Sequence, residues 1–363
     1  MFKMHTFEMK KMFYGHNEFS KTLNDLKGVG HPQYSHNENS QVYTYYVKKG
    51  IVILLFRCRY VENSITIKIN PQKVLGEEQQ ENLFELNEKK FVDCLILVQK
   101  ILEKNNIKLN EFIISRIDFT RDIKFEKSEI IDIYIKLLNK AGAPYRYIYK
   151  KYGDEIYKNS YEIINTNRLY SIAVYNKERE SELRNKRSAK MQGVMRAEVR
   201  IMDIAELKEI FSAKTLQFDK IVTMQDYAKM ILTNAFVDGF YIKLEKSKKI
   251  LYEEYYSRKA TKRQKNKIEK MIELIETIAI HRSAYDCTRG TNALYSYNTI
   301  NSIISGFAEK RINIISISAN EHISVLPDLK YILGIKTESE ISKDNKFLAD
   351  NNLINKIPKY NIL

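Results

Sequence analysis

Three segments near the start of the chain are rich in β-branched and aromatic residues and are separated by Lys49-Gly50 and by Asn63. Such apolar segments between breaks are typical of β-strands. We therefore expect three antiparallel strands, at residues 41–48, 51–60 and 64–70. The residues before them are only weakly periodic, and the polar stretch at 31–40 predicts a loop.

Later segments mix strand and helix periods. Asn87 can cap a helix whose apolar positions recur every three to four residues up to residue 105, and a second helix is predicted at 128–140, ending at Gly142. Further strands are expected at 111–123, 144–151, 168–177 and 194–201, with a weaker one at 156–163. This order predicts an α+β fold, in which a mostly antiparallel sheet carries helices on one face.

Strand signals fade after about residue 204, and helical patterns replace them. We expect helices at residues 205–211, 224–251, 263–280 and 298–307. The sequence thus predicts a mixed N-terminal segment (1–40), an α+β domain (41–203), a boundary region (204–222) and a mainly helical, basic C-terminal domain (223–363).

Charge adds an expectation about the partner. The chain has 363 residues, and 60 Lys and Arg against 45 Asp and Glu give a net charge of +15. Such an excess favours nucleic acid as a partner, ahead of an anionic membrane. No apolar run approaches the roughly 20 residues of a membrane helix. Because the first residues also lack an apolar signal segment, we expect a cytoplasmic protein that makes no membrane contact.

Residue types argue against several other classes of protein. The three cysteines, Cys58, Cys94 and Cys287, are far apart and odd in number, which indicates a reducing compartment without a disulfide framework. The six histidines lack the spacing of a zinc site. The glycines lack the spacing of a phosphate-binding loop, which argues against a motor or helicase.

The most informative predicted strand gathers charged residues on one face. Arg116, Asp118 and Asp122 alternate there with apolar Ile117 and Phe119. Aspartate is disfavoured in strands, so two on one face indicate either a site or a solvated face. At about 3.3 Å per residue the two carboxylates lie roughly 13 Å apart along the strand, too far to hold one ion by themselves.

Two further predicted strands have a comparable polar face. The strand at 194–201 carries Glu198 opposite an apolar face, and the strand before it carries Tyr175 and Lys177 on one side. In a shared sheet, one face could gather Asp118 and these three side chains into a cluster of metal ligands and nucleophile. An exposed half-sheet with ion pairs explains the same pattern, and alternation alone leaves both interpretations open.

Four blocks of residues carry a family resemblance. In order they are Ile67-Lys68-Ile69-Asn70-Pro71-Gln72-Lys73-Val74-Leu75, Arg116-Ile117-Asp118-Phe119-Thr120-Arg121-Asp122, Val174-Tyr175-Asn176-Lys177-Glu178-Arg179-Glu180 and Arg196-Ala197-Glu198-Val199. This ordered set, which spans about residues 65–203, resembles the replication initiation factor family, also called Rep trans. The family includes rolling-circle plasmid initiators, filamentous-phage initiators and some conjugative relaxases.

The resemblance implies a HUH-like or ferredoxin-like nicking domain at residues 41–203. Tyr175 matches the family's DNA-cleaving nucleophile, and Asp118 and Glu198 match its ligands for Mg²⁺ or Mn²⁺. Such a tyrosine displaces the 3′-oxygen of a phosphodiester and leaves a 5′-phosphotyrosine. Lys177 is expected either to stabilise the tyrosinate or to contact phosphate.

The metal shell implied by the resemblance is incomplete. Asp122 and Glu180 match family acids and are further candidate ligands. Arg200 stands where plasmid members carry a second acid after the fourth block, so the shell is expected to be thinner, or completed by Glu178, Glu180 or water.

Basic residues are the expected DNA contacts. The candidates are Arg116, Arg179, Arg184, Lys186, Arg187, Arg196, Arg200, Lys262, Arg263 and Lys265. Those between 179 and 190, with Lys190, predict a mobile basic loop or short helix near the cleaved phosphate. Residues 241–270 hold 11 Lys and Arg, four acids and three interleaved tyrosines, Tyr252, Tyr255 and Tyr256. This mixture suits backbone contact with base stacking, and a solvated helix face explains it equally well.

Three functions remain open from the sequence. A rolling-circle initiator would nick an origin hairpin or single strand and recruit a host helicase. A conjugative relaxase would apply the same chemistry at a transfer origin. A DNA-binding regulator would keep the fold without the reaction. A homodimer would fit the two strand transfers of a replication cycle.

Overall fold

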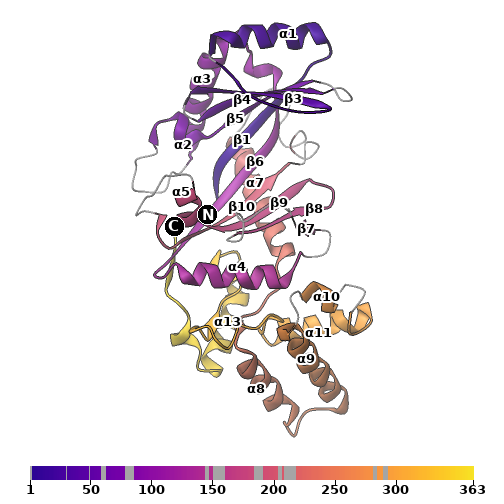
Figure 1. The fold of residues 1–363 in the computed structure, drawn as a ribbon. Coiled ribbons are helices and arrows are strands. Elements are labelled where there is room, and N and C mark those ends of the chain that lie inside the picture. Colours follow the sequence, from indigo (N-terminus) through magenta and orange to yellow (C-terminus); the bar gives the residue numbers. More distant parts are fainter. Residues whose placement is uncertain are drawn as a thin grey trace. The chain divides into compact units, whose positions relative to one another are not determined.

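The structure is a computed structural model. It describes residues 2–29, 31–48, 50–58, 63–77, 86–143, 147–149, 160–183, 191–202, 207, 218–280, 284–288 and 293–363. The predicted α+β class is confirmed: an 11-stranded antiparallel sheet is joined by helices, which dominate the C-terminal part (Figure 1). The chain divides into two compact units. Unit 1 comprises Met1–Thr120, Asn167–Ser171 and Glu198–Ala228, and unit 2 comprises Arg121–Thr166, Ile172–Ala197 and Lys229–Leu363.

Unit 1 is built on strands in the order β2-β3-β4-β5-β1-β6. Their bounds are β1 (Lys3–Met12), β2 (Gln33–Asn37), β3 (Ser40–Lys48), β4 (Ile51–Cys58), β5 (Ser64–Ile69) and β6 (Ile113–Phe125). β1 comes first in the chain, yet it pairs antiparallel with both β5 and β6. The register brings Glu8 of β1 opposite Arg116 of β6.

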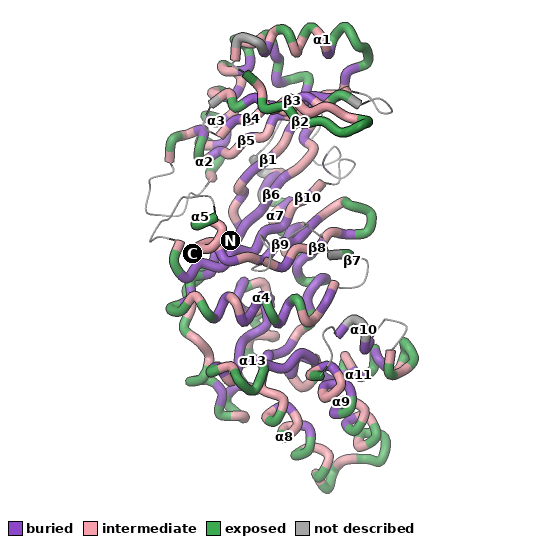
Figure 2. The backbone as a smooth tube through the Cα atoms, viewed as in Figure 1, coloured by how far each residue is buried: buried purple, intermediate pink, exposed green. Residues whose placement is uncertain are grey.

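The helices of unit 1 are α1 (His16–Asp25), η1 (Leu26–Val29), α2 (Pro71–Val74), α3 (Glu88–Glu103) and η3 (Leu109–Glu111). Two of them, α2 and α3, begin at asparagine side chains that cap them. Asn87 caps α3, as predicted, because its side chain accepts a hydrogen bond from the Lys90 amide at 2.9 Å. The ring of Phe91 lies 6.0 Å from that of Phe7 on β1, which fixes α3 against the sheet. Figure 2 shows the resulting buried positions along β1 and α3.

Unit 2 continues the sheet and adds the C-terminal helices. Its strands are β7 (Tyr147–Tyr149), β8 (Ser160–Asn165), β9 (Tyr170–Asn176), β10 (Val194–Ile201), β11 (Tyr241–Ile242), β12 (Val325–Leu326) and β13 (Tyr360–Ile362), of which β9 and β10 also give residues to unit 1. Its helices are α4 (Glu129–Ala141), α5 (Lys177–Leu183), α7 (Phe218–Ala235), shared with unit 1, α8 (Leu244–Tyr255), α9 (Lys262–Ile280), α10 (Ala284–Thr288), α11 (Tyr297–Glu309), α12 (Leu329–Ile332), α13 (Glu338–Asp350) and η6 (Ile354–Lys356). β13 pairs with the end of β6, so the last residues of the chain complete this unit.

Tyr134 of α4 holds the core of unit 2 together. Its ring is fully buried, 5.6 Å from the ring of Phe125 on β6 and 6.3 Å from that of Tyr241 on β11. Its hydroxyl donates a hydrogen bond of 2.8 Å to the carbonyl of Pro327. A buried tyrosine hydroxyl usually has a hydrogen-bond partner. Here that partner lies almost two hundred residues away in the chain, so this hydrogen bond connects α4 to the segment around Pro327.

Several expected elements need correction. The first 40 residues, read as a mixed segment with a loop at 31–40, contain strand β1 and strand β2, which pairs with β3. The single helix expected at 224–251 is wrong, because α7 ends at Ala235 and α8 begins at Leu244. Gly239 lies between them with φ +115°, a conformation that a helix does not contain. The helix expected at 205–211 falls almost wholly outside the described residues, as do parts of the strands expected at 144–151 and 156–163.

Candidate functional site

The charged face of β6 is buried in unit 1. Asp118 is almost fully buried, and Arg116 holds it with two hydrogen bonds, from Nε to Oδ1 at 2.6 Å and from Nη2 to Oδ2 at 2.7 Å. Arg116 also donates from Nη1 to Oε1 of Glu8 at 3.0 Å. The solvated face considered for this strand is therefore wrong, since these carboxylates are compensated by ion pairs and not by water.

Glu198 of β10 is the second predicted metal ligand in unit 1. It is also buried, and Arg200 donates from Nε to its Oε1 at 2.6 Å. Burial raises the pKa of Asp118 above its usual range, against the lowering effect of Arg116, and the negative charge of Glu198 adds to the rise. The two carboxylates are thus close enough for their charges to interact.

These two carboxylates fit a divalent cation in part. Mg²⁺ prefers oxygen ligands and is commonly held by one or two carboxylates, with water and substrate phosphate completing the shell. Within the described ranges of the chain, no group of three or more His, Cys, Asp or Glu side chains comes together as a metal site. Asp118 and Glu198 therefore offer a two-carboxylate site, in which an ion has to compete with Arg116 and Arg200.

The predicted nucleophile lies at a junction between strand and helix in unit 2. Tyr175 is partly exposed near the end of β9, and α5 begins at Lys177. The buried side chain of Asn176 accepts hydrogen bonds from the amides of Glu178 at 3.1 Å and Arg179 at 3.4 Å, which starts the helix. Tyr175 thus lies in the predicted strand, whereas Lys177, expected on the same strand, belongs to helix α5.

Lys177 lies beside the tyrosine ring. Its Nζ is 5.7 Å from the centroid of the Tyr175 ring, and it forms an ion pair with Glu180 one helical turn away. Burial lowers the pKa of Lys177, and the neighbouring positive charge of Arg196 lowers it further, while Glu180 and Asp122 oppose the shift.

Asp122 and Glu180, the other two predicted ligands, also belong to unit 2. Arg196 grips Asp122 with two hydrogen bonds of 2.6 Å, and both side chains are buried. Such a bidentate pair is strong and geometrically specific. Asp122 thus positions Arg196, and Glu180 positions Lys177. The other two acids, Asp118 and Glu198, belong to unit 1. A pocket shared by all of these groups stays a prediction.

Sequence reasoning missed the residues that anchor α5. Glu178 accepts hydrogen bonds from the hydroxyl of Ser128 and from the amide of Gly193, the latter at 3.3 Å. Arg179 forms an ion pair with Asp132 of α4. These contacts join residues up to 65 positions apart, and no local pattern marks them. Of the basic loop or short helix predicted at 179–190, only Arg179 lies in α5, a helix that also carries three glutamates. Arg184, Lys186, Arg187 and Lys190 lie outside the described residues, so this segment stays a prediction.

The predicted DNA contacts that the structure describes differ in exposure. Arg116, Arg196 and Arg200 make the ion pairs described above and are largely buried. Arg179 is 41% exposed but forms an ion pair with Asp132. Lys262 and Arg263 lie exposed at the start of α9, and Lys265 is partly exposed beside them. These three residues of α9 are therefore the most accessible to a phosphate backbone among the described candidates.

Comparison with known proteins adds no assignment. No family model matches the chain, and the search of curated proteins finds no match. In the part of the chain that the structure describes, no helix has the length and apolar character needed to cross a bilayer. Cys94 and Cys287, both described, are buried and unpaired.

Proposed function

We propose that this protein nicks and rejoins one DNA strand at a replication origin through a covalent tyrosine intermediate. The end of β9 carries the proposal, because the ammonium of Lys177 lies over the ring of a partly exposed Tyr175. A phenol ionises only near about pH 10. A neighbouring cation favours the phenolate and so makes the tyrosine oxygen a better nucleophile at neutral pH.

In the proposed step the Tyr175 oxygen attacks a backbone phosphorus, and the bond from that phosphorus to the 3′-oxygen breaks. The phenolic proton is released, and the departing 3′-oxygen gains a proton. The products are a 5′-phosphotyrosine and a free 3′-hydroxyl. One ester replaces another, so the reverse step rejoins the strand without a nucleotide cofactor.

The proposal assigns Asp118 and Glu198 to a divalent ion, Mg²⁺ or Mn²⁺. When bound, the ion supplies charge stabilisation at the phosphate oxygens. The two carboxylates would then exchange Arg116 and Arg200 for the cation. The guanidinium groups released in this way could bind the phosphates of a DNA strand, because one guanidinium can donate two parallel hydrogen bonds to one phosphate.

A second candidate is a DNA-binding regulator without the reaction. One observation favours it: Asp118, Asp122, Glu180 and Glu198 each form an ion pair with a basic side chain. A network of this kind is also what a purely structural cluster requires. The relaxase alternative shares the proposed chemistry and differs in the DNA sequence that is cut.

The test compares wild type with Tyr175→Phe on a supercoiled plasmid that carries the DNA flanking the coding region of this chain. With Mn²⁺, wild type should convert the plasmid to the open circular form and leave a protein adduct at a 5′ end. Tyr175→Phe should lose both products and retain DNA binding. Tyr170→Phe, on the same strand, is the matched control and should nick like wild type.

The outcomes separate the candidates. Full nicking by Tyr175→Phe removes the nucleophile assignment. Binding by wild type without nicking, in Mg²⁺ and in Mn²⁺, favours the regulator. Asp118→Asn with Glu198→Gln should abolish Mn²⁺-dependent nicking and also the rise in melting temperature that Mn²⁺ alone gives to wild type.

A further inference from the structure

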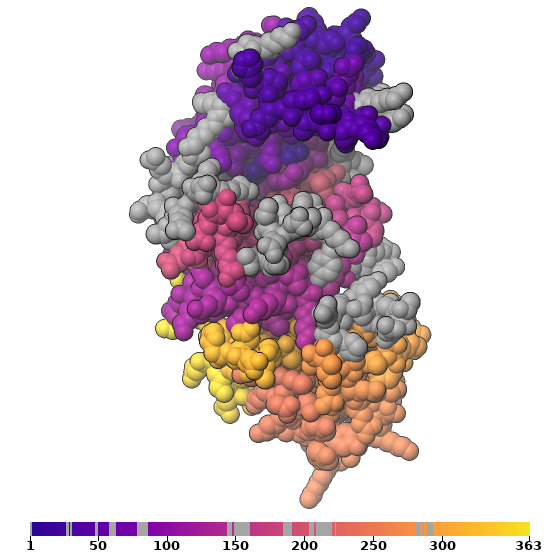
Figure 3. Space-filling model, viewed as in Figure 1, coloured from indigo at the N-terminus to yellow at the C-terminus, as the bar shows by residue number. Residues whose placement is uncertain are grey.

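A helical hairpin in unit 2 presents a surface that the proposed reaction does not use. α8 and α9 are joined by residues 256–261 and pack through buried side chains, among them Leu251 and Ile268 (Figure 1). The turn is fixed by the Thr261 hydroxyl and amide, which both donate to Oε1 of Gln264. Figure 3 shows this segment at the surface of unit 2. The tip is therefore an ordered and accessible element.

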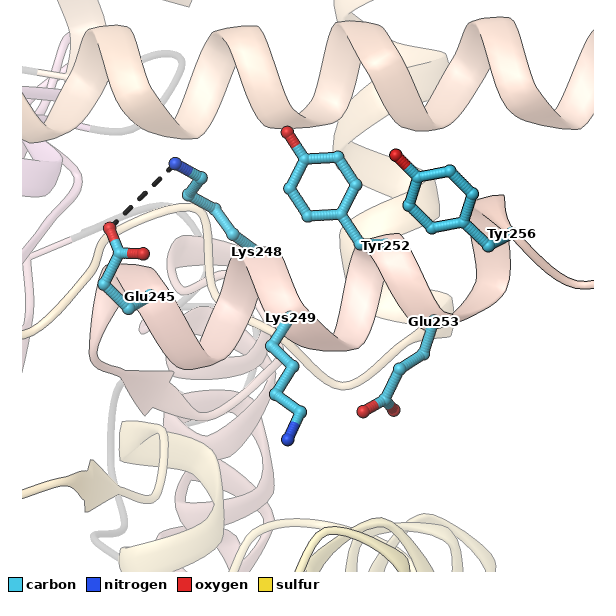
Figure 4. Close-up of a pocket in the computed structure, with 6 residues that line it drawn as sticks. All are labelled: Glu245, Lys248, Lys249, Tyr252, Glu253 and Tyr256. Atoms are coloured by element: carbon cyan, nitrogen blue, oxygen red, sulfur yellow. Dashed lines mark ion pairs between the residues drawn. The ribbon is translucent and has the colours of Figure 1, made fainter.

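Two tyrosines form an open aromatic surface on α8. Tyr252 and Tyr256 are four residues apart, their rings are stacked with centroids 6.0 Å apart and planes 22° apart, and they are 38% and 74% exposed. They line an open surface pocket of about 550 Å³ (Figure 4), with Lys248 on the same side of the helix. Tyr256 in particular gains little from core packing, so stability alone does not explain an aromatic pair at this surface.

Contacts behind the pair hold it in place. Tyr255 meets Tyr256 edge-on at 5.1 Å, and its hydroxyl donates to Glu269 of α9 at 2.7 Å. Lys265 of α9 lies 5.4 Å from the centroid of the Tyr255 ring. The rings are thus preorganised, which lowers the entropy lost when a flat ligand binds to them.

The hairpin is also strongly basic. Residues 241–270 contain 11 Lys and Arg against four acids. Lys248 and Lys267 are paired with glutamates. A further set at the tip and beside the tyrosines is exposed and has no ion pair within the described residues: Lys249, Arg258, Lys259, Lys262 and Arg263. These charges complement a polyanion.

We propose that the α8–α9 hairpin binds single-stranded DNA, with bases stacked on Tyr252 and Tyr256 and phosphates on the basic tip. Paired bases in a duplex already stack on each other, so exposed flat rings are of use only to an unpaired strand. The inference rests on the proposed function, since nicking and strand displacement supply such a strand. The hairpin then holds the displaced strand while Tyr175 keeps the other end.

The test measures binding of the full chain to fluorescent oligothymidine of about 20 nucleotides, by anisotropy and with EDTA present. Loss of one base stack weakens binding by about 5- to 150-fold, so Tyr252→Ala with Tyr256→Ala, which removes both rings, should weaken binding by at least about 5-fold. Tyr256→Phe keeps the ring and should bind like wild type. Tyr297→Ala removes another tyrosine of unit 2, 68% exposed, and should also bind like wild type.

Charge and strand type complete the test. Lys262→Gln with Arg263→Gln should flatten the slope of log affinity against log salt by about 0.7 for each lost phosphate contact. A duplex of the same length should compete poorly. The inference is overturned if the alanine variant binds oligothymidine like wild type, or if it loses duplex binding alone.

The design separates this inference from the proposed function. The oligonucleotide carries no origin and EDTA removes metal, so Tyr175→Phe should bind it normally. If wild type nicks the plasmid and Tyr252→Ala with Tyr256→Ala binds oligothymidine normally, the hairpin site is overturned and the proposed reaction stands. Binding that depends on the tyrosines, in a protein that never nicks, would support the hairpin site and overturn the reaction.

Discussion

At the scale of single residues, each buried charged side chain in the described part of the chain lies in an ion pair with an opposite charge. Asp328, Lys336 and Asp344 form such a cluster in unit 2: the ammonium lies 2.6 Å from one carboxylate and 2.7 Å from the other, and all three side chains are buried. Burial alone would lower the pKa of Lys336, but the two carboxylates outweigh it and raise the pKa. The lysine therefore stays charged in the core.

Removing that charge should be costly. Lys336→Met leaves the buried carboxylate of Asp328 without a cation and leaves Asp344 with only Arg311, whose Nε lies 3.5 Å away. We therefore expect the free energy of unfolding to fall by about 3–5 kcal/mol. Urea unfolding followed by circular dichroism measures the loss. Lys359→Met is the control, because that side chain is 84% exposed and its Nζ lies 3.9 Å from Glu126. A change of about 0–1 kcal/mol is expected there, and an equal loss in both variants would contradict the argument.

The residues of the candidate site were only partly predictable. Alternation placed Asp118 and Asp122 on one strand face and left open whether that face is solvated, and in the structure both acids are buried. Alternation did not reveal the arginine that pairs with each acid, Arg116 of β6 for Asp118 and Arg196 of β10 for Asp122. These pairs depend on the register of the strands and on side-chain rotamers, which the sequence pattern does not give. Glu8 is the clearest omission: it lies on a strand whose pairing partner is about a hundred residues away.

At the scale of elements, the start of β10 depends on one glycine. Gly193 has φ +69°, and a Cβ at this position would lie 2.4 Å from the carbonyl oxygen of Phe125. The Phe125 amide donates to the Gly193 carbonyl at 2.8 Å, so the two backbones are already in close contact. No side chain fits between them, and β10 keeps its place beside the end of β6 for that reason.

Gly193→Ala should therefore destabilise unit 2 by about 2–5 kcal/mol, because it adds left-handed strain and a backbone clash. Chemical unfolding of the purified variant measures the effect. Gly76→Ala is the matched control: its φ is +73°, but nothing lies within 4 Å of the added Cβ. It should cost only the strain, about 1–2 kcal/mol. Similar losses in the two variants would show that the close approach does not matter.

Elements with a strong local signal were predicted well. β3, β4 and β5 are rich in β-branched and aromatic residues, β10 alternates, and α3 carries both a cap and an apolar stripe. β1 was missed because its place between β5 and β6 is decided by long-range pairing, and its mixture of Met and Lys has little β character of its own. The false long helix arose from neglect of Gly239, which approaches the backbone of Ile312 too closely for any Cβ.

At the scale of the whole molecule, proton binding links the folded core to pH. The chain contains 25 tyrosines, and an exposed tyrosine has a pKa of about 10. Burial raises the pKa of Tyr134 and of Tyr241 well above that value. The raised pKa of Lys336 acts in the same direction, because the folded protein also keeps this proton longer than the unfolded chain.

Above about pH 10 the unfolded chain therefore binds fewer protons than the folded protein at these three groups. These three groups should therefore leave the free energy of unfolding unchanged below about pH 10. Above that pH each group should lower it by about 1.4 kcal/mol per pH unit. Absorbance at 295 nm and urea unfolding, measured from about pH 8 to about pH 11, follow ionisation and stability together. The two buried tyrosines should ionise only as the protein unfolds. In Tyr134→Phe one ionising group is absent, so the free energy of unfolding should decrease less steeply with pH. Ionisation of all 25 tyrosines in a single step near about pH 10, with an unchanged circular dichroism spectrum, would mean that the packing around Tyr134 and Tyr241 admits water.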